Sequence, residues 1–225
     1  MAAVRWALEP ISSERSGPMK VLDLAAGTGK LTGVLCAEGH NVTAVEPDEA
    51  MLGELVRLHG GVRALPGTAE RIPLPDGTVD AVVAGQAFHW FDYERAMTEI
   101  ARVLRPGGVV AGLWNADDPS VEWVVEFGQV SMSPVSAKDF PATNFMPDHP
   151  LFTGGGQTEF PHSQRRTAET LMATVRTTSH MLISTPEEQD ETVKRMREFL
   201  SARPETAAGE FDFPIRTYVK RLVRL

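Results

Sequence analysis

The sequence predicts an α/β protein built on a doubly wound, mostly parallel sheet. Three observations predict this class: short apolar runs alternate with segments of helical periodicity, glycines close the helical segments, and a turn of small residues follows the first apolar run. Strands and helices that alternate through right-handed crossovers form a parallel sheet whose ligand binds at the carboxyl ends of the strands. The functional residues are therefore expected just after strands.

The first half of the chain contains five predicted strands. The run at 20–24 is short and apolar, which suits a strand buried on both faces of a parallel sheet. The other four strands are predicted at 41–45, 62–65, 79–84 and 109–114. Apolar residues at helical spacing predict helices over 31–35, 51–58 and 96–104, which end at Gly39, at Gly60-Gly61 and at Arg105-Pro-Gly-Gly108.

The second half of the chain departs from this alternation. Prolines and the triplet Gly154-Gly-Gly156 interrupt it beyond Asn115, which indicates an insertion over the sheet. Strands are predicted at 157–160 and 213–222, and helices at 167–177 and 186–202. The chain finishes with four basic residues, which on an acidic protein suit a solvated edge strand: Arg216, Lys220, Arg221 and Arg224.

Composition limits the partners of the protein. The chain has 225 residues, of which 42% are apolar, and this suffices for a core in one main domain. Its 22 Lys and Arg against 30 Asp and Glu give a net charge of −8, which repels nucleic acid and anionic membrane surfaces. No stretch approaches the roughly 20 apolar residues that cross a bilayer, and no signal peptide is visible. We expect a cytoplasmic protein with a small-molecule partner.

No metal site is predicted. The only cysteine, Cys36, lies in an apolar stretch that favours a buried thiol in a reducing compartment. The histidines of the second half are scattered without the spacing of metal ligands.

The turn after the first strand narrows the class of ligand. Residues 21–30 read VLDLAAGTGK, and a glycine turn between strand and helix lets a ligand approach the backbone. A phosphate-binding P-loop is excluded, because Leu24 stands where its first glycine belongs and Leu31 where Ser or Thr belongs. A dinucleotide fingerprint is weakened, because Thr32 replaces its third glycine. An NAD-dependent oxidoreductase therefore stays open as an alternative.

A third ligand class fits the turn better. Asp23 on the strand is followed by small residues at Ala25, Gly27 and Gly29, so the amino-acid end of a ligand can lie against the turn. Glu46 closes the second strand 19 positions after Gly27, the distance at which an acid on the neighbouring strand accepts hydrogen bonds from ribose hydroxyls.

Five blocks in order carry a family resemblance. They are VLDLAAGTG at 21–29, AVEPD at 44–48, GTAERIPLP at 67–75, VDAVVAGQAFHWF at 79–91 and LRPGG at 104–108. The chain resembles the class I S-adenosylmethionine-dependent methyltransferases, and within them it is similar to the small-molecule type related to trans-aconitate methyltransferases, with a methyltransferase type 11-like domain. The resemblance implies a Rossmann-like sheet of seven strands with a C-terminal cap insertion and a last antiparallel strand. Residues 1–114 would bind the cofactor, and residues 115–225 would complete the sheet and add substrate-cap helices within the same domain.

The resemblance also implies which residues bind S-adenosyl-L-methionine. The methionine part would lie against the turn, the ribose against Glu46, the adenine edge against Pro47 and Met51, and the adenine amino group near Ala69 and Glu70. Gln86 would lie beside the reactive methyl. The implied cofactor-binding residues are Asp23, Ala25, Gly27, Thr28, Gly29, Glu46, Pro47, Met51, Ala69, Glu70 and Gln86.

Residues 86–91 supply candidates for the acceptor site. Aromatic faces attract a sulfonium cation, so His89, Trp90 and Phe91 are candidate substrate-binding residues, with core packing as the alternative for the two aromatic residues. His89 is the candidate catalytic base for proton removal as the methyl transfers, although a purely structural histidine stays open. Methyl transfer needs no base where alignment with the sulfonium suffices.

The acids of the implied cofactor site have structural alternatives. Asp23 could cap a helix or pin the turn, Glu46-Pro-Asp48 could be a turn with an N-cap, and Glu70 could be only a hydrated loop acid.

We therefore expect methyl transfer from S-adenosylmethionine to a small-molecule acceptor. A binding protein without turnover is the second hypothesis, because Ala25 stands where the family commonly has its first glycine and only residues 1–19 precede the first strand, where the family usually has a longer segment. The sequence leaves open the acceptor, the atom methylated, whether the short N-terminus is native, and the oligomeric state, for which a homodimer is one option.

Overall fold

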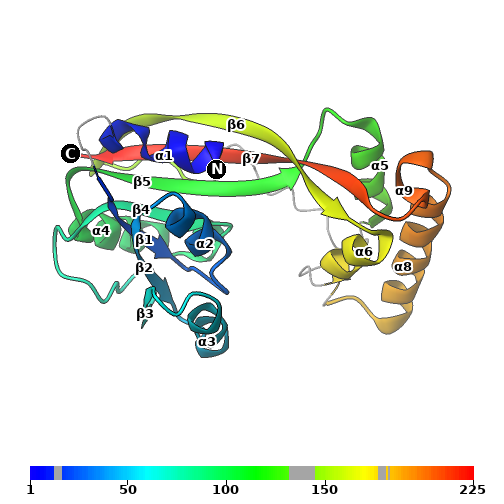
Figure 1. Cartoon of the computed structure of the whole chain (residues 1–225), viewed down its shortest axis with the longest axis horizontal. Helices are drawn as coiled ribbons and strands as arrows, with labels where there is room; N and C mark the ends of the chain where they lie inside the picture. The colour runs from blue at the N-terminus through cyan, green and yellow to red at the C-terminus, as the bar shows by residue number, and fades with distance from the viewer. Residues whose placement is uncertain (13–16, 132–144, 177–180, 182) are drawn as a thin grey trace. The chain divides into compact units, whose positions relative to one another are not determined.

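Seven strands form one sheet in the order β3-β2-β1-β4-β5-β7-β6 (Figure 1). The structure is a computed structural model of the chain, and it describes residues 1–12, 17–131, 145–176, 181 and 183–225. The strands are β1 Lys20–Leu24, β2 Asn41–Glu46, β3 Arg63–Pro66, β4 Val79–Gly85, β5 Leu104–Asp117, β6 Phe152–Arg166 and β7 Phe211–Arg224. The helices are α1 Ala2–Ser12, α2 Lys30–Ala37, α3 Glu49–Leu58, η1 Phe88–Trp90, α4 Tyr93–Val103, α5 Glu122–Ser131, α6 Ala168–Arg176, α8 Pro186–Ser201 and α9 Pro204–Ala207.

The strand directions confirm the predicted fold class. β1 pairs in parallel with β2 and β4, β2 with β3, and β4 with β5. β7 runs opposite to β5 in Figure 1, as the resemblance implies for the last strand. The prediction that the basic finish forms an edge strand is wrong, because β7 lies between β5 and β6. Its basic side chains are paired rather than solvated; Lys220 Nζ, for example, lies 3.0 Å from Asp148 Oδ1.

The chain divides into two compact units. The first contains Met1–Trp114, Pro141–Phe160 and Thr217–Leu225, and the second contains Asn115–Phe140 and Pro161–Arg216. The ranges show that β5, β6 and β7 each contribute residues to both units.

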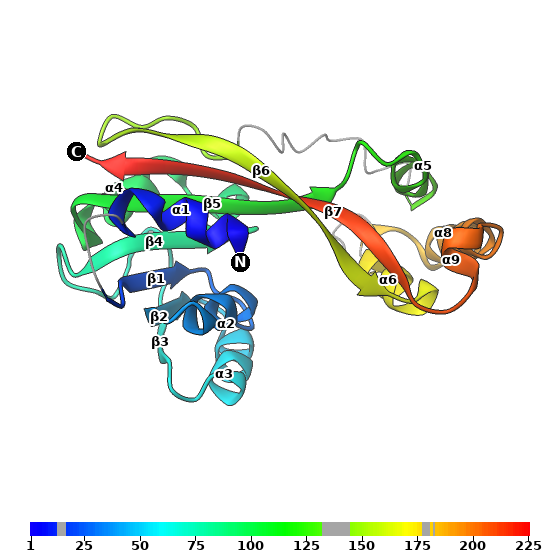
Figure 2. The same ribbon diagram turned by 45° about the horizontal axis from the view of Figure 1, so that its top comes forward.

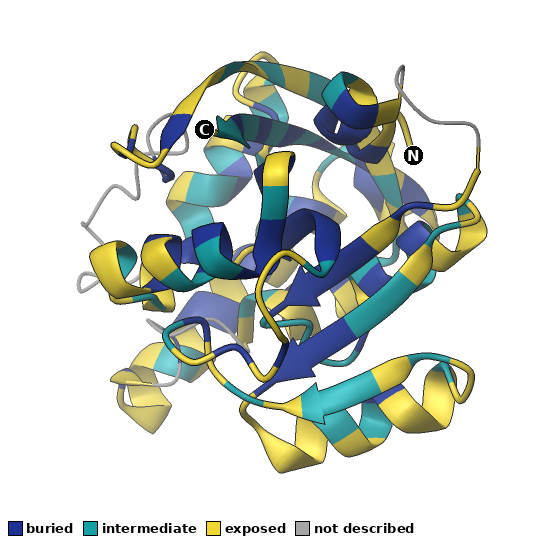
Figure 3. Cartoon of the chain, turned by 90° about the vertical axis from the view of Figure 1, so that its left-hand side faces the viewer, coloured by how far each residue is buried: buried dark blue, intermediate teal, exposed yellow. Residues whose placement is uncertain are grey.

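The first unit is a sheet with helices on both faces. Side chains of β1, β4 and β5 alternate between two apolar clusters: Val21, Ala81 and Val109 pack with α1 and α2, whereas Leu22 and Val82 pack with α4. The central parallel strands are buried on both faces, as their continuous apolar runs predict (Figure 3).

Helix α1 was not expected from the sequence. It has no acidic residue in its first turn, no basic residue in its last turn, and Pro10 near its end, so local signals are weak. Its stability comes from tertiary packing, because Val4, Ala7, Leu8 and Ile11 are fully buried in the cluster that also covers β1 and β4.

The second unit packs helices α5, α6 and α8 on one face of β7 (Figure 2). Phe211, Phe213 and Ile215 alternate with exposed or half-buried residues and enter the apolar cluster of these helices. Helix α5 was not predicted, because prolines dominate the sequence signal beyond Asn115. Residue 177, the predicted end of the next helix, lies outside the described residues.

Cys36 is exposed in the structure, so the expectation of a buried thiol is wrong. It occupies the last turn of α2, where the buried face of the helix carries Thr32 and Leu35 instead.

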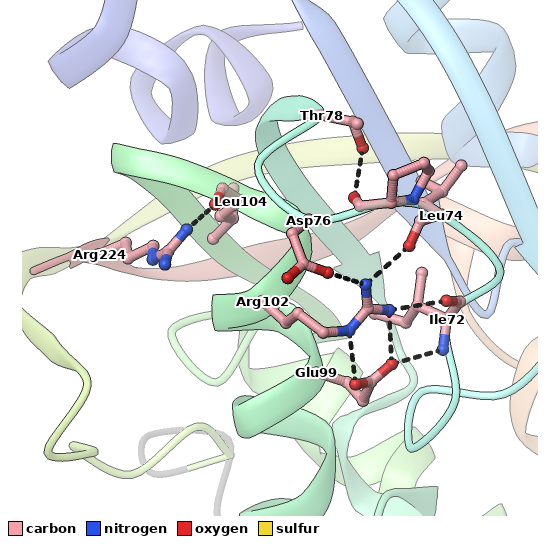
Figure 4. Close-up of polar contacts among 9 residues, drawn as sticks. Ile72, Leu74, Asp76, Thr78, Glu99, Arg102, Leu104 and Arg224 are labelled. Carbon is pink, nitrogen blue, oxygen red and sulfur yellow. Dashed lines mark hydrogen bonds and ion pairs between the residues drawn. The ribbon is translucent and has the colours of Figure 1, made fainter.

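Arg102 of α4 holds the segment between β3 and β4 (Figure 4). Its Nε and Nη2 donate to both carboxylate oxygens of Glu99 at 2.8 Å, and Nη1 donates to Asp76 Oδ1 at 2.7 Å. The same guanidinium donates to the carbonyl oxygens of Ile72 and Leu74 at 3.0 and 2.8 Å. The pKa of Glu99 is lowered, first of all by its hydrogen bond from Arg102. This planar fork fixes the loop that directly follows residues 69 and 70.

We expect Arg102→Lys to lower the free energy of unfolding by about 1–3 kcal/mol, because an ammonium cannot replace five fork-shaped hydrogen bonds. Chemical denaturation measures the change. Arg95→Lys is the matched control, since Arg95 is exposed and lies 4.0 Å from Asp92, and it should change stability by less than about 0.5 kcal/mol. Equal effects of the two substitutions would contradict a special role for the fork.

Candidate cofactor site

A cavity of about 470 Å³ lies in the first unit, lined by residues that follow strands β1, β2, β3 and β4. This is the carboxyl edge of the parallel strands, where open α/β sheets bind ligands. The lining residues are Ala25, Gly27, Glu46, Pro47, Asp48, Met51, Gly67, Thr68, Ala69, Glu70, Gly85, Gln86, Ala87, Trp90 and Phe91.

The turn between β1 and α2 forms one wall of the cavity. Ala26 N donates to Val45 O at 3.1 Å, which ties the turn to β2. Ala25, Gly27 and Gly29 have φ of 55°, 57° and 86°, in the left-handed region that favours glycine. Ala25 therefore carries a conformational cost that glycine would avoid.

Gly29 is required for packing as well as conformation. A Cβ built on it would lie 2.7 Å from His59 Cδ2 and 2.9 Å from Leu55 Cγ. The backbone at the start of α2 thus approaches the end of α3 more closely than a side chain permits. Gly29 therefore faces α3, and it does not line the cavity.

Glu46 joins the turn to the next strand. Its carboxylate is buried, and it accepts a hydrogen bond from Gly27 N at 2.8 Å and another from Asp48 N at 3.0 Å. Each carboxylate oxygen retains acceptor capacity after these bonds. Glu46 thus stabilises the turn and also presents acceptor oxygens to the cavity that it lines.

Asp23 lies beneath the turn and does not line the cavity. Its Oδ2 accepts a hydrogen bond of 2.6 Å from Thr32 Oγ1, whereas its Oδ1 is buried without a hydrogen-bond partner. Burial raises the pKa of Asp23 to about 7, with the nearby Glu46 charge adding to the shift and the Thr32 hydrogen bonds opposing it. This hydrogen bond agrees with the structural alternative, in which Asp23 pins the turn. The other carboxylate oxygen, Oδ1, can still accept a hydrogen bond from another donor.

A second wall follows β2 and β3. Asp48 Oδ1 accepts from Met51 N at 2.9 Å and caps α3, so the N-cap alternative for this segment is realised. Met51 is exposed by 46% and contributes apolar surface to the cavity. Glu70 Oε1 accepts from Asp92 N at 2.9 Å. Burial alone would raise the pKa of Glu70, but hydrogen bonds from the backbone and from Thr68 outweigh it and hold this pKa below its usual range.

The third wall follows β4. Gln86 has φ of 58°, and Gln86 N donates to Leu113 O at 2.9 Å, which turns the chain out of the strand. Phe88 is buried in the core and anchors the short helix η1, so the next two residues point outward. Trp90 is 74% exposed and Phe91 packs partly against the core, and both line the cavity.

His89 does not line the cavity in this structure. Its ring lies 4.6 Å from the Trp90 ring and 5.1 Å from the Trp114 ring, measured between centroids. Burial lowers the pKa of His89, which favours the neutral imidazole near pH 7. Its position next to the lining residue Trp90 is compatible with either of its two predicted roles.

The cavity brings together most of the residues that the sequence singles out. It contains Ala25, Gly27, Glu46, Pro47, Met51, Ala69, Glu70, Gln86, Trp90 and Phe91. Asp23, Thr28, Gly29 and His89 lie outside the lining. Five lining residues were not predicted, namely Asp48, Gly67, Thr68, Gly85 and Ala87. All five lie inside the sequence blocks quoted above. Their position next to a predicted strand end could have identified them, whereas their residue types could not.

Within the described ranges, no three His, Cys, Asp or Glu side chains gather in a way that could hold a metal ion. Among the same residues, no helix combines the length and the apolar composition that spanning a membrane requires.

The fold and the cavity together define an α/β protein with a candidate ligand site at the carboxyl ends of its parallel strands, and comparison with known proteins gives its family. Residues 22–112 match the methyltransferase domain model. The chain is 37% identical over 205 residues to an uncharacterized methyltransferase of Mycobacterium bovis, covering 91% of this chain and 80% of the relative. The chain therefore belongs to the class I S-adenosylmethionine-dependent methyltransferases and is an enzyme of that class.

Further similarities cover the domain or the fold. The malonyl-[acyl-carrier protein] O-methyltransferase of Pectobacterium atrosepticum is 38% identical over 100 residues, which cover 44% of this chain and 40% of that enzyme. A solved structure from Anaeromyxobacter dehalogenans, assigned to the type II methyltransferases, has a TM-score of 0.67 and 24% identity, over 99% of this chain and 94% of that one. The geranyl diphosphate C-methyltransferase of Streptomyces coelicolor, solved with S-adenosyl-L-homocysteine, has a TM-score of 0.53 and 13% identity, over 100% and 77%.

Ala25→Gly should raise the free energy of unfolding by about 0.5–1 kcal/mol, because the left-handed conformation costs alanine more than glycine loses in unfolded-state entropy. Ala26→Gly is the neighbouring control, since Ala26 does not have a positive φ, and it should lower stability by about 0.4–1 kcal/mol. Urea unfolding of both variants tests the difference, and the same sign for both would contradict it.

Asp23→Asn should stabilise the protein more at pH 8 than at pH 5. The folded pKa of about 7 exceeds the ordinary aspartate value of 3.8 that applies in the unfolded chain, so the folded state holds a proton that the unfolded state has lost, and stability falls as the pH rises through this window. The melting temperature difference from wild type should grow between the two pH values by at least about 3 °C. Asp190→Asn, at an exposed position of α8, controls for the loss of one charge. A difference that stays constant with pH would show that Asp23 is ionised throughout.

Proposed function

We propose that this enzyme transfers the methyl group of S-adenosylmethionine to a small-molecule acceptor, with the cofactor bound in the cavity at the carboxyl ends of β1, β2 and β4. The observation that carries the proposal is Glu46. A buried carboxylate held by two backbone N–H groups lies at the cavity wall, next to a turn that is nearly free of side chains. This arrangement suits a ligand with a ribose and an adjoining polar tail.

The residues present fit the two polar ends of such a cofactor. The unpartnered Oδ1 of Asp23 is a buried acceptor directly below the turn, and an ammonium group is a suitable donor for it. The Gly27 backbone leaves room beside it, because an added Cβ would meet no atom closer than Met51 Sδ at 3.9 Å. Asp23, Ala25 and Gly27, with Thr28 and Gly29 behind them, would hold the amino-acid end.

Glu46 would accept hydrogen bonds from the ribose hydroxyls through the acceptor capacity that its two backbone bonds leave. The apolar surfaces of Pro47, Met51 and Ala69 would contact the adenine, and Glu70 would lie near its amino group. Gln86 would contact the methionine part. The solved complex of the Streptomyces coelicolor relative with S-adenosyl-L-homocysteine supports this choice of cofactor.

The cofactor supplies an electrophilic methyl group on a sulfonium. The residues of this chain contribute position and environment: Trp90 and Phe91 present aromatic surface at the cavity, which stabilises positive charge, and the walls orient the acceptor. His89, whose pKa is lowered by burial, would be neutral and able to accept a proton from a hydroxyl or amine acceptor near pH 7. A carboxylate acceptor would not require this step.

Two observations support a metabolite as the acceptor. The net charge of −8 disfavours a polyanionic acceptor, and the Pectobacterium atrosepticum relative is named for a malonyl group on a carrier protein. The family assignment favours methyl transfer over the nicotinamide alternative.

Binding measurements test this proposal. Calorimetry should detect S-adenosylhomocysteine binding at about micromolar Kd, or about −8 kcal/mol, and NADH should not bind. Saturable NADH binding without S-adenosylhomocysteine binding would overturn the assignment.

The ribose contact is tested with S-adenosylhomocysteine and its 2′-deoxy analogue. The wild type should bind the deoxy analogue more weakly by about 1–3 kcal/mol, because a hydrogen bond to a carboxylate is lost. Glu46→Ala should weaken binding of the parent compound and remove the preference between the two ligands. Glu49→Ala, an exposed acid on α3, should preserve it. If Glu46→Ala weakened both ligands equally and kept the preference, Glu46 would act only through the turn.

A further inference from the structure

The strands of the second unit have two chemically different faces. On one face, Arg165 of β6 lies 3.4 Å from Glu210, the residue just before β7, and 3.5 Å from Asp212 of β7, measured between nitrogen and carboxylate oxygen. On the same face of β7, Arg216 Nη2 lies 2.9 Å from Asp118 Oδ1. Side chains alternate along a strand, so the opposite face carries the neighbours of these residues.

That opposite face forms one side of an open cavity of about 410 Å³ within the second unit. Phe213 and Ile215 of β7 form an apolar floor, and Phe127 of α5 and Leu171 of α6 add apolar walls. β7 lies between β5 and β6, so the floor is flanked on one side by Asp117 of β5 and on the other by Arg166 of β6.

Arg166 is the unusual residue in this cavity. Its Nη2 donates to Gln164 Oε1 on the same strand, whereas its Nε is buried with no hydrogen-bond partner. Among the residues that the structure describes, no carboxylate lies within 4.0 Å of this guanidinium. Its neighbour Arg165 has two acidic partners on the other face. A guanidinium that lines a cavity without a carboxylate partner can pair with the anionic group of a ligand.

Asp117 does not neutralise Arg166. The two strands that carry them are separated by β7, and two strand spacings amount to about 10 Å. Asp117 is an exposed residue, but surrounding atoms desolvate its carboxyl group and raise its pKa. The cavity therefore has a cationic edge at Arg166 and no fixed anion next to it.

We propose that this cavity binds a small amphipathic carboxylic acid, with its carboxylate paired with the Arg166 guanidinium and its apolar body on Phe213 and Ile215. The cavity lies wholly within the second unit, so this site does not depend on the cofactor site or on the proposed reaction. A cationic ligand would be repelled by Arg166. A phosphate dianion would bring two charges to a site with one guanidinium, on a protein with a net charge of −8.

Calorimetry with four probes of one chain length tests the ligand class: octanoate, 1-octanol, octylamine and octyl phosphate. Octanoate should bind at least about tenfold more tightly than the other three, since a charge-assisted hydrogen bond is worth about 1.4 kcal/mol or more. Equal binding of octanoate and 1-octanol would show a purely apolar cavity, and tighter binding of octylamine or octyl phosphate would show a different class. Any of these results overturns the proposal.

Charge-matched variants test the position of the site. Arg166→Gln should weaken octanoate about tenfold or more and leave 1-octanol within about twofold. Arg165→Gln removes the same charge from the opposite face and should leave octanoate binding unchanged. If Arg166→Gln does not fold, Thr174→Glu answers the same question, because Thr174 is an exposed residue of α6 that lines the cavity. It should weaken octanoate about threefold or more and spare 1-octanol. Equal losses in Arg165→Gln and Arg166→Gln, or no loss in Thr174→Glu, would overturn the assignment of this cavity.

Discussion

The Glu46 carboxylate is the interaction on which the carboxyl edge of the parallel strands depends. It accepts backbone hydrogen bonds from Gly27, in the turn after β1, and from Asp48, at the start of α3. Two chain segments that are 19 residues or more apart in sequence are thereby fixed by one side chain at adjacent strand ends. The same carboxylate lines the cavity, so its structural role is compatible with the proposed contact to a ribose.

Asp23 lowers the stability of the fold at this edge and leaves a carboxylate oxygen without a hydrogen-bond partner. Its burial raises the pKa to about 7, and only one of its two oxygens has a partner. A protein optimised only for stability would place an amide or an apolar residue here, because an unpaired buried carboxylate is costly. Ala25 adds a second local cost through its left-handed conformation. Both costs lie within three residues of the cavity wall, where sites that bind ligands commonly store strain.

The second unit is organised by the alternation of side chains along β7. One face carries ion pairs, and the other carries aromatic and aliphatic residues that pack with α5, α6 and α8. Because β7 lies between β5 and β6, the chemistry of its apolar face is completed by residues from strands that are distant in sequence. The Arg166 guanidinium has no carboxylate partner among the described residues, whereas the neighbouring Arg165 pairs with Glu210 and Asp212 on the opposite face.

The sequence by itself determined the parallel strands, the glycine turn and most residues of the cavity wall, because apolar periodicity and turn residues are local signals and strand ends converge at one edge of a parallel sheet. Only the tertiary structure decided the rest. Helix α1 is stabilised by packing rather than by caps, β7 lies inside the sheet although its composition suits an edge, and Asp23 points beneath the turn toward Thr32. Arg166 of β6 and Asp117 of β5 lie on opposite sides of the apolar floor of the second cavity, because β7 lies between their two strands. Strand order and side-chain partners arise from contacts between distant residues, which no local pattern encodes.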